Sequence, residues 1–143
     1  MFEQITIAFA TWDFWQLLVT ATIPLALHHY AKTTTTMNAI NELRGKSVSL
    51  WNEIDCISKV FDQLEQKDRH RIMSYLNEYD HFCTLFNEGL ISRKLARKTR
   101  KTTIINAYVI HEEFIRRWRD EYDREAWKNL QSCAERLQKS RKK

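Results

Sequence analysis

An uncharged stretch near the N-terminus is the clearest feature in the pattern of hydrophobic and polar positions. It runs for 18 residues, from Phe14 to Ala31. A helix of this length rises roughly 27 Å, close to the ~30 Å thickness of the hydrocarbon core of a bilayer. Aromatic side chains lie near both ends, as they do at membrane interfaces. We therefore predict a transmembrane helix in segment 1–31. Its predicted interface residues are Trp12, Trp15, Tyr30 and Lys32.

Two other interpretations of this stretch stay open. A cleaved signal peptide needs basic residues before its apolar core, whereas here Glu3 and Asp13 precede it. A buried helix of a folded domain is the second alternative, but such helices rarely run this far without a charge. A membrane span is the favoured interpretation, although four residues reduce the hydrophobicity of the stretch. They are Gln16, Thr20, Thr22 and Pro24.

Helical periodicity dominates from residue 47 onward. Apolar residues recur there at steps of three and four, which marks the buried face of a helix. Four segments show this spacing: 47–64, 72–86, 95–118 and 127–137, the last in a helix that is expected to start near Asp123. Asp68 is expected to cap the second helix, Gly89 to end it in a left-handed conformation, and Ser92 to cap the long third helix. The large residues predicted in the core are Trp51, Phe61, Phe82 and Trp127.

These patterns predict an all-α protein, with one N-terminal transmembrane helix followed by a small bundle of about four helices, one of them long. Only two glycines and one proline occur, which argues against a sheet protein with its frequent turns. The four threonines at 33–36 form either a short neck or a continuation of the membrane helix. The predicted segments are a membrane segment at 1–31, a juxtamembrane neck at 32–46, a cytoplasmic helical domain at 47–137 and a basic tail at 138–143.

Charge is distributed unevenly along the chain. All 23 Lys and Arg residues lie at or after Lys32, and the part from residue 32 onward carries a formal charge of +7. Because basic flanks stay in the cytoplasm, we predict a bacterial inner-membrane protein with its N-terminus outside and its helical domain inside. The three cysteines are odd in number and form no CxxC pair, which suits buried thiols in a reducing compartment.

The strongest local charge signal is a basic segment with six Lys and Arg residues among nine. As a helix it places the arginines on one stripe with the lysines beside it. Three interpretations compete: a solvated helix face, a patch that docks on anionic lipid, and nucleic-acid binding as the weaker alternative, because stacking residues are scarce nearby. The candidate anionic-surface patch consists of Arg93, Lys94, Arg97, Lys98, Arg100 and Lys101.

No convincing catalytic, cofactor or metal motif is present in the sequence. His111-Glu112-Glu113 begins like a zinc-protease helix, but position 115, where the second histidine is required, is an isoleucine. His81 and Cys83 would point about 200° apart on a helix, so the imidazole could not activate the thiol. We therefore predict that the protein is not an enzyme, that it needs no cofactor, and that it has no catalytic or metal-binding residues.

Three segments resemble a family of small bacterial and phage-associated, membrane-anchored helical domains of unknown function. They are Leu76-Asn77-Glu78-Tyr79-Asp80, then Gly89-Leu90-Ile91-Ser92, and the Trp-rich end from Trp118 to Trp127. The resemblance covers about residues 40–137 and implies an α-helical, membrane-tethered protein without a known activity. It also implies a structural role for Asn77 and Asp80, fixing a turn or bonding between helices.

The function predicted from these features is binding rather than catalysis. The leading interpretation is a single-pass, membrane-anchored binding or scaffold protein that acts through self-association or through a protein partner. The alternative is a small membrane-acting effector, of the phage-exclusion or defence type, which perturbs the bilayer when it clusters. In that case Gln16, Thr20 and Thr22 would face a helix–helix seam.

Overall fold

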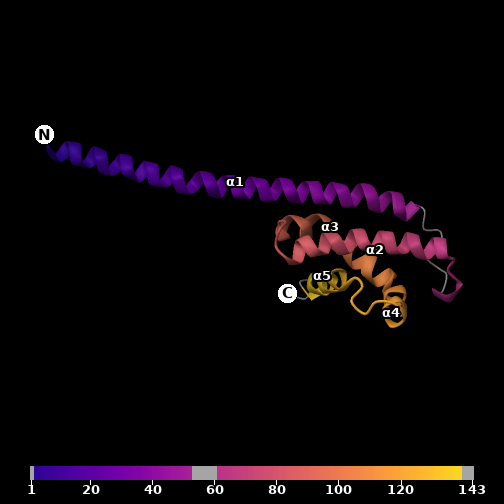
Figure 1. Ribbon diagram of the computed structural model, residues 1–143. Helices are drawn as coiled ribbons and strands as arrows, with labels where there is room; N and C mark the ends of the chain where they lie inside the picture. The colour runs from indigo at the N-terminus through magenta and orange to yellow at the C-terminus, as the bar shows by residue number, and fades with distance from the viewer. Residues whose placement is uncertain (1, 53–60, 140–143) are drawn as a thin grey trace. The chain divides into compact units, whose positions relative to one another are not determined.

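The computed structural model describes the backbone of residues 2–52 and 61–139, and the side chains of residues 14–49 and 61–139. Every regular element within these residues is helical, which confirms the predicted all-α class (Figure 1). The chain divides into two compact units, Met1–Thr34 and Thr35–Lys143. The predicted core residue Trp51 and the predicted interface residue Trp12 have side chains outside the described residues.

The first unit consists of the N-terminal part of helix α1 (Phe2–Asn52). The helix continues through Pro24. Two threonine hydroxyls bond back to carbonyls of their own helix: Thr20 Oγ1 donates to Gln16 O at 2.6 Å, and Thr22 Oγ1 donates to Leu18 O at 2.6 Å. These hydroxyls are therefore satisfied without a partner from another segment.

The predicted transmembrane helix is not supported. Within the described residues, no helix combines the length and the apolar character that crossing a membrane requires. The physical reason lies in the composition of the stretch 14–31, where Gln16, Pro24 and the pair His28-His29 interrupt the apolar residues. The absence of charge, on which the prediction depended, does not by itself make a segment apolar enough.

The second unit begins with the C-terminal part of α1, from Thr35 to Asn52. Thr36, Ile40, Leu43 and Ser47 are buried on one face of this helix, at steps of four, three and four. The predicted neck at 32–46 is thus helical, and three of its residues, Thr36, Ile40 and Leu43, are buried. The predicted helix over 47–64 is tested only in part, since residues 53–60 lie outside the described residues: its start lies in α1, but Val48, expected on the buried face, is 53% exposed. Phe61, at the start of the short 3₁₀ helix η1 (Phe61–Gln63), is buried as predicted.

Helix α2 (Gln66–Asn87) has the predicted buried face. All seven expected core positions are buried: Ile72, Tyr75, Leu76, Tyr79, Phe82, Cys83 and Phe86. The predicted N-cap is wrong, since Asp68 lies within the first turn and the residue before the helix is Glu65, in an extended conformation. An acidic residue in the first turn still interacts favourably with the helix dipole. Gly89 follows the helix with φ +76°, as predicted for a left-handed end.

The predicted long third helix is interrupted. Helix α3 (Arg93–Ile110) begins after Ser92, whose Oγ accepts a hydrogen bond from Leu95 N at 3.4 Å, as predicted. The helix stops at His111, and α4 (Glu112–Glu121) follows directly. The break occurs where His111 Nδ1 lies 2.9 Å from Ala107 O, so this side chain bonds to the backbone one turn earlier. Two glutamates then occupy the first turn of α4, where they favour a new helix start.

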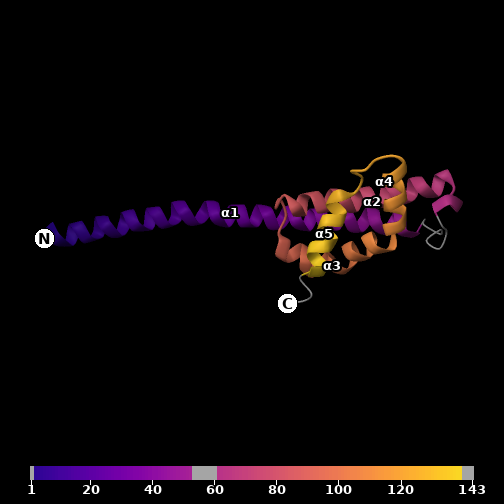
Figure 2. The same ribbon diagram turned by 90° about the horizontal axis from the view of Figure 1, so that it is seen from below.

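Helix α5 (Lys128–Lys139) packs against α2 and α3, while α4 packs against α3 and η1. Figure 2 shows α5 crossing the pair formed by α2 and α3. The predicted buried residues of this helix are confirmed, with Leu130 and Ala134 fully inaccessible and Leu137 nearly so. The helix begins at Lys128, later than the expected start near Asp123, because residues 124–127 form a turn.

The polar pair on α2 has the structural role that the resemblance implies. Asp80 Oδ1 accepts a hydrogen bond from Leu130 N at 2.8 Å, so this carboxylate caps the start of α5. Asn77 Oδ1 accepts a bond from the indole Nε1 of Trp127, also at 2.8 Å. Trp127 has φ +54°, an uncommon conformation for a bulky residue. These two bonds therefore fix the turn that leads into α5.

Candidate functional site

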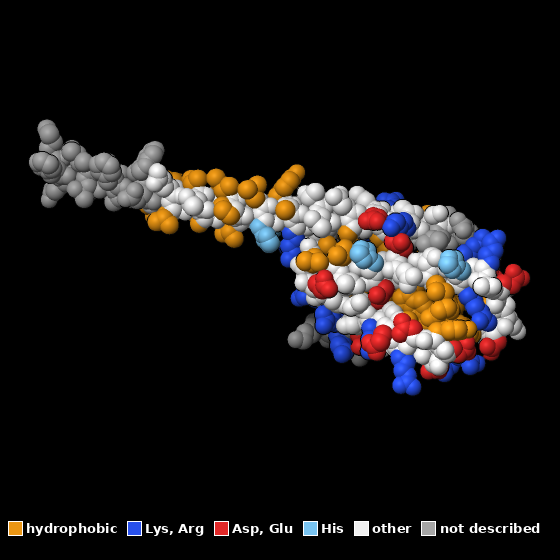
Figure 3. All heavy atoms as spheres, viewed as in Figure 1, with side chains coloured by type: hydrophobic (Ala, Val, Ile, Leu, Met, Phe, Trp, Pro, Cys, Tyr) orange, Lys and Arg blue, Asp and Glu red, His pale blue; other side chains and the backbone are white. Residues whose placement is uncertain are grey.

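The described part of the first unit is an apolar surface. Nine large apolar side chains between residues 14 and 30 are between 38% and 71% exposed. They include the two predicted interface residues Trp15 and Tyr30, while Lys32 is half-buried. Figure 3 shows apolar side chains on opposite edges of this part of α1. The nine residues are Phe14, Trp15, Leu17, Leu18, Val19, Ile23, Leu25, Leu27 and Tyr30.

The predicted basic patch lies at the start of α3, but its members have different environments. Lys94, Arg97 and Lys98 are exposed. Arg93 bonds the end of α2, because its Nη2 donates to Asn87 O at 3.0 Å and its Nε to Phe86 O at 3.3 Å. Arg93 thus satisfies carbonyls that a helix C-terminus leaves without a partner. Charge removal at Arg93 would weaken the fold as well as the patch.

Arg100 also departs from a solvated stripe. It is half-buried, and its Nη2 donates to Ile40 O of α1 at 3.2 Å. Its guanidinium therefore faces α1, unlike the exposed side chains of Arg97 and Lys98. Lys101, the last member of the patch, is half-buried. The residues free to meet a flat anionic surface are thus fewer than the sequence indicates.

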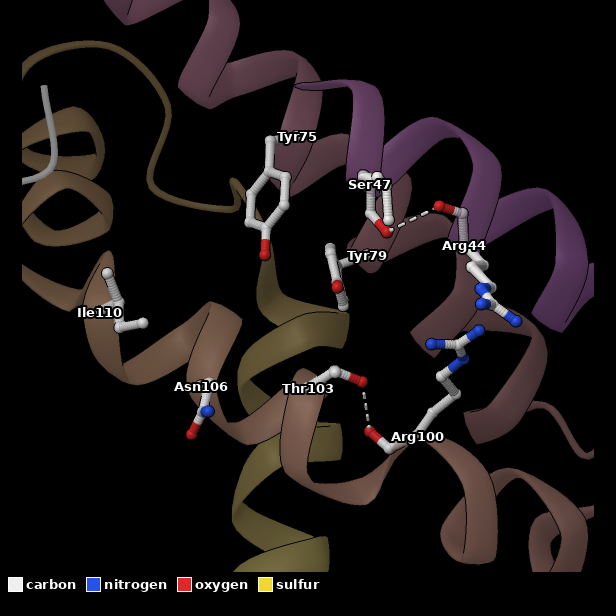
Figure 4. Close-up of a pocket in the computed structure, with 9 residues that line it drawn as sticks. Arg44, Ser47, Tyr75, Tyr79, Arg100, Thr103, Asn106 and Ile110 are labelled. Atoms are coloured by element: carbon white, nitrogen blue, oxygen red, sulfur yellow. Dashed lines mark hydrogen bonds between the residues drawn. The ribbon is translucent and has the colours of Figure 1, made fainter. Parts of the chain in front are cut away.

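The second unit contains a cleft of about 390 Å³ between α1, α2 and α3. Figure 4 shows Arg44 reaching from α1 and Arg100 from α3, so that their guanidinium groups face each other. Tyr75 and Tyr79 of α2 line the same cleft. The remaining lining residues are Ser47, Val48, Thr103, Asn106 and Ile110.

The electrostatic environment of this cleft is positive. Among the described residues, no acidic side chain lines the cleft and no carboxylate forms an ion pair with Arg44 or Arg100. Burial, and to a lesser extent the neighbouring Tyr79, raise the pKa of Tyr75 well above its ordinary value, so this hydroxyl stays neutral. The cleft therefore presents two cations, with neutral hydroxyl and apolar groups around them.

Sequence reasoning missed this cleft. From the sequence, Arg44 is only one of the basic residues that follow the apolar stretch, and Arg100 is only a member of the basic patch. A usable signal exists in the spacing, because Arg44, Ser47 and Val48 share one side of a helix, as do Arg100 and Thr103. What no spacing indicates is that α1 extends to Asn52 and brings these two sides together.

The buried His111 is part of the core of the second unit. Its ring centroid lies 5.4 Å from that of Tyr75, and it is 4% exposed. Since Nδ1 faces a carbonyl that can only accept, Nδ1 carries the proton of the neutral ring. Burial lowers the pKa of His111 below its ordinary value.

We expect the stability of the protein to fall as the pH drops below about 6.5. A histidine with a lowered pKa in the folded state binds its proton first in the unfolded chain, so acid favours unfolding, whereas above the ordinary pKa both states are neutral. Thermal unfolding measured between pH 7.5 and pH 5.5 should show this loss. His111→Gln should reduce the pH dependence, while the exposed control His81→Gln should retain it; equal pH dependence in both variants would contradict this role.

The cysteines behave as buried thiols. Cys83 and Cys133 are free and fully inaccessible, whereas Cys56 lies outside the described residues. The neighbouring Cys133 thiol and burial together raise the pKa of Cys83, so this thiol is a poor nucleophile. His81 on the same helix is exposed while Cys83 is buried, so the two side chains point away from each other, as the helical spacing predicts.

The comparisons with known proteins place the chain in a family. No significant match exists among curated proteins or among solved structures. A profile for a domain of unknown function, DUF4760, matches residues 3–137. The match includes all three segments in which the sequence resembles a helical family of unknown function, and it extends into the N-terminal helix. Since it spans nearly the whole sequence, the chain belongs to the DUF4760 family of domains of unknown function.

Proposed function

We propose that the protein is a membrane-attached helical binding protein, in which the N-terminal part of α1 is the attachment segment. The observation that carries this proposal is the exposed apolar surface of residues 14–30. Covering one large apolar side chain contributes about 1.5–3 kcal/mol. Nine such side chains, already partly shielded by their own helix, therefore favour an apolar environment by an amount on the order of 10 kcal/mol.

The distribution of these side chains favours lipid over a single partner helix. Leu17, Leu18 and Val19 are consecutive, and successive residues of a helix point about 100° apart. Apolar side chains therefore face several directions, whereas one packed helix covers a single side. Lipid chains, in contrast, cover every side of a helix that is buried among them. The attachment we propose is burial of this segment among the lipid chains or at their boundary with the headgroups.

Two further features support this attachment. Thr20 and Thr22 bond to carbonyls of their own helix, so they bring no unsatisfied hydroxyl into an apolar environment. The part of the chain from residue 32 onward carries a charge of +7, and each basic residue near an anionic leaflet contributes about 1 kcal/mol. We accordingly propose the cytoplasmic face of the bacterial inner membrane as the location of the helical domain, with a second copy or a protein partner bound to it.

The membrane-acting effector is the competing function. It requires that clustered helices perturb the bilayer, with Gln16, Thr20 and Thr22 at their seam. The bonds of both threonines to their own helix reduce the need for such a seam. Leakage of a dye from liposomes on addition of the full chain would favour the effector, and intact liposomes with bound protein would favour the binding protein.

The proposal is tested by fractionating cells that express the full chain. We expect it to pellet with membranes and to remain there after a wash with 1 M salt. At this concentration the Debye length is about 3 Å, so charge attraction is screened, whereas apolar burial is not. A chain with Glu121→Cys in the exposed α4 terminus should react with an impermeant maleimide only after lysis. Recovery in the soluble fraction, or labelling at Glu121→Cys in intact cells, would contradict attachment or location, respectively.

A further inference from the structure

We propose that the cleft between α1, α2 and α3 is a binding site for a small organic phosphate. The two guanidinium groups of Arg44 and Arg100 meet at this cleft without a carboxylate among the lining residues (Figure 4). Two like charges that face each other repel, and a bound anion relieves this repulsion. The site is separate from the apolar segment and independent of the proposed membrane attachment.

The position of Arg100 is fixed before any ligand binds. Its Nη2 donates to Ile40 O, which holds the guanidinium between α3 and α1. Its Nε is buried and has no hydrogen-bond partner within the described residues. An inaccessible N–H of a charged group without a partner is costly, and an acceptor that enters the cleft would reduce that cost. Arg44 is exposed and can close on the same acceptor from α1.

The number of donors points to phosphate rather than carboxylate. One guanidinium fork binds two oxygen atoms side by side, and a carboxylate has no more than two. A pair of forks suits an anion with three or more oxygens around one centre, which describes a phosphate ester. The hydroxyls of Ser47 and Thr103 donate to Arg44 O and Arg100 O, so the arginines are the principal donors.

The rest of the cleft suits the organic part of such a molecule. Its volume of about 390 Å³ exceeds what inorganic phosphate needs and falls within the usual range of small-molecule sites, roughly 300–1,000 Å³. Tyr75 and Tyr79, which are 6% and 4% exposed, contribute ring edges to its wall, with ring centroids 4.9 Å apart. Val48 and Ile110 add apolar contacts at the rim, where they are 53% and 45% exposed.

Calorimetric titration of the full chain in neutral detergent tests the proposal, with AMP as the probe. We expect AMP to bind, inorganic phosphate to bind more weakly, and adenosine to bind at least tenfold more weakly than AMP. Arg44→Gln should weaken AMP binding by about 10- to 100-fold, the usual effect of a hydrogen bond to a charged group. Arg97→Gln is the matched control, because Arg97 is an exposed arginine of α3, and it should bind AMP like the native chain.

Two further measurements separate the possible outcomes. Circular dichroism of Arg44→Gln should match the native chain, since the Arg44 side chain is exposed and makes no hydrogen bond or ion pair with the described residues. Titration in mixed micelles with phosphatidic acid identifies the source of the phosphate: weakened AMP binding indicates a lipid headgroup, and unchanged binding a soluble ester. Absence of AMP binding, equal binding of adenosine, or equal losses in Arg44→Gln and Arg97→Gln would overturn the proposal.

Discussion

Replacing Trp127 by alanine should lower the free energy of unfolding by about 3–5 kcal/mol. The side chain is 5% exposed, and its ring centroid lies 5.9 Å from that of Phe114 and 6.0 Å from that of Trp118. Its indole N–H also donates to Asn77 Oδ1. The substitution therefore removes a large apolar side chain and leaves a cavity where α2, α4 and the start of α5 meet.

Urea unfolding of the full chain, followed by circular dichroism, measures this effect. Leu90→Ala is the control, because Leu90 is 54% exposed and surface substitutions usually change stability by less than about 0.5 kcal/mol. The loss of stability in Trp127→Phe should lie between those of Trp127→Ala and Leu90→Ala, since phenylalanine keeps most of the apolar contact but loses the hydrogen bond to Asn77. A Trp127→Ala chain as stable as Leu90→Ala would show that the turn into α5 is not packed as described.

Two arginines in the apolar segment should release the protein from membranes. A charged side chain within the apolar part of a bilayer costs roughly 2.5–3.5 kcal/mol by insertion measurements, so Leu18→Arg with Ile23→Arg should cost about 5–7 kcal/mol. This corresponds to a partition coefficient that is lower by about 10³-fold or more. Both native residues are exposed, at 38% and 52%, so the substitutions disturb no internal contact of the described chain.

Flotation of the purified chain with liposomes gives the measurement. The matched control carries Leu90→Arg and Val109→Arg, which change two apolar residues of similar exposure in the helical domain. We expect the control to float with the liposomes and the first variant to remain at the bottom. Equal flotation of both variants would mean that residues 14–30 do not carry the attachment.

Local signals predicted the middle of the domain well. In α2 the apolar spacing alone identifies every buried residue, because one helix face meets one continuous core. Gly89 and Ser92 mark a helix end and a helix start through their own backbone chemistry, which does not depend on distant contacts. The resemblance added Asn77 and Asp80, whose role depends on a turn 50 residues away.

Features that depend on distant contacts were not predictable in the same way. The buried face of the second half of α1 includes Thr36 and Ser47, so it does not look apolar. Thr36 is buried because its Oγ1 accepts a hydrogen bond from Ser92 N at 2.7 Å. The break at His111 lies within a sequence that could form one helix, at the residue whose side chain bonds to Ala107 O. The arginine pair of the cleft joins two helices 56 residues apart, which no local pattern indicates.

The most direct test of the proposed attachment is to identify the molecules that contact position 18 in the cell. A photoreactive benzoylphenylalanine at position 18 of the full chain would be crosslinked by light in living cells, and its adducts identified by mass spectrometry. The same group at position 121, on the exposed end of α4, is the control. Membrane attachment predicts lipid adducts at position 18 and few or none at position 121. Adducts at position 18 that contain only protein, whether a second copy or another chain, would contradict it.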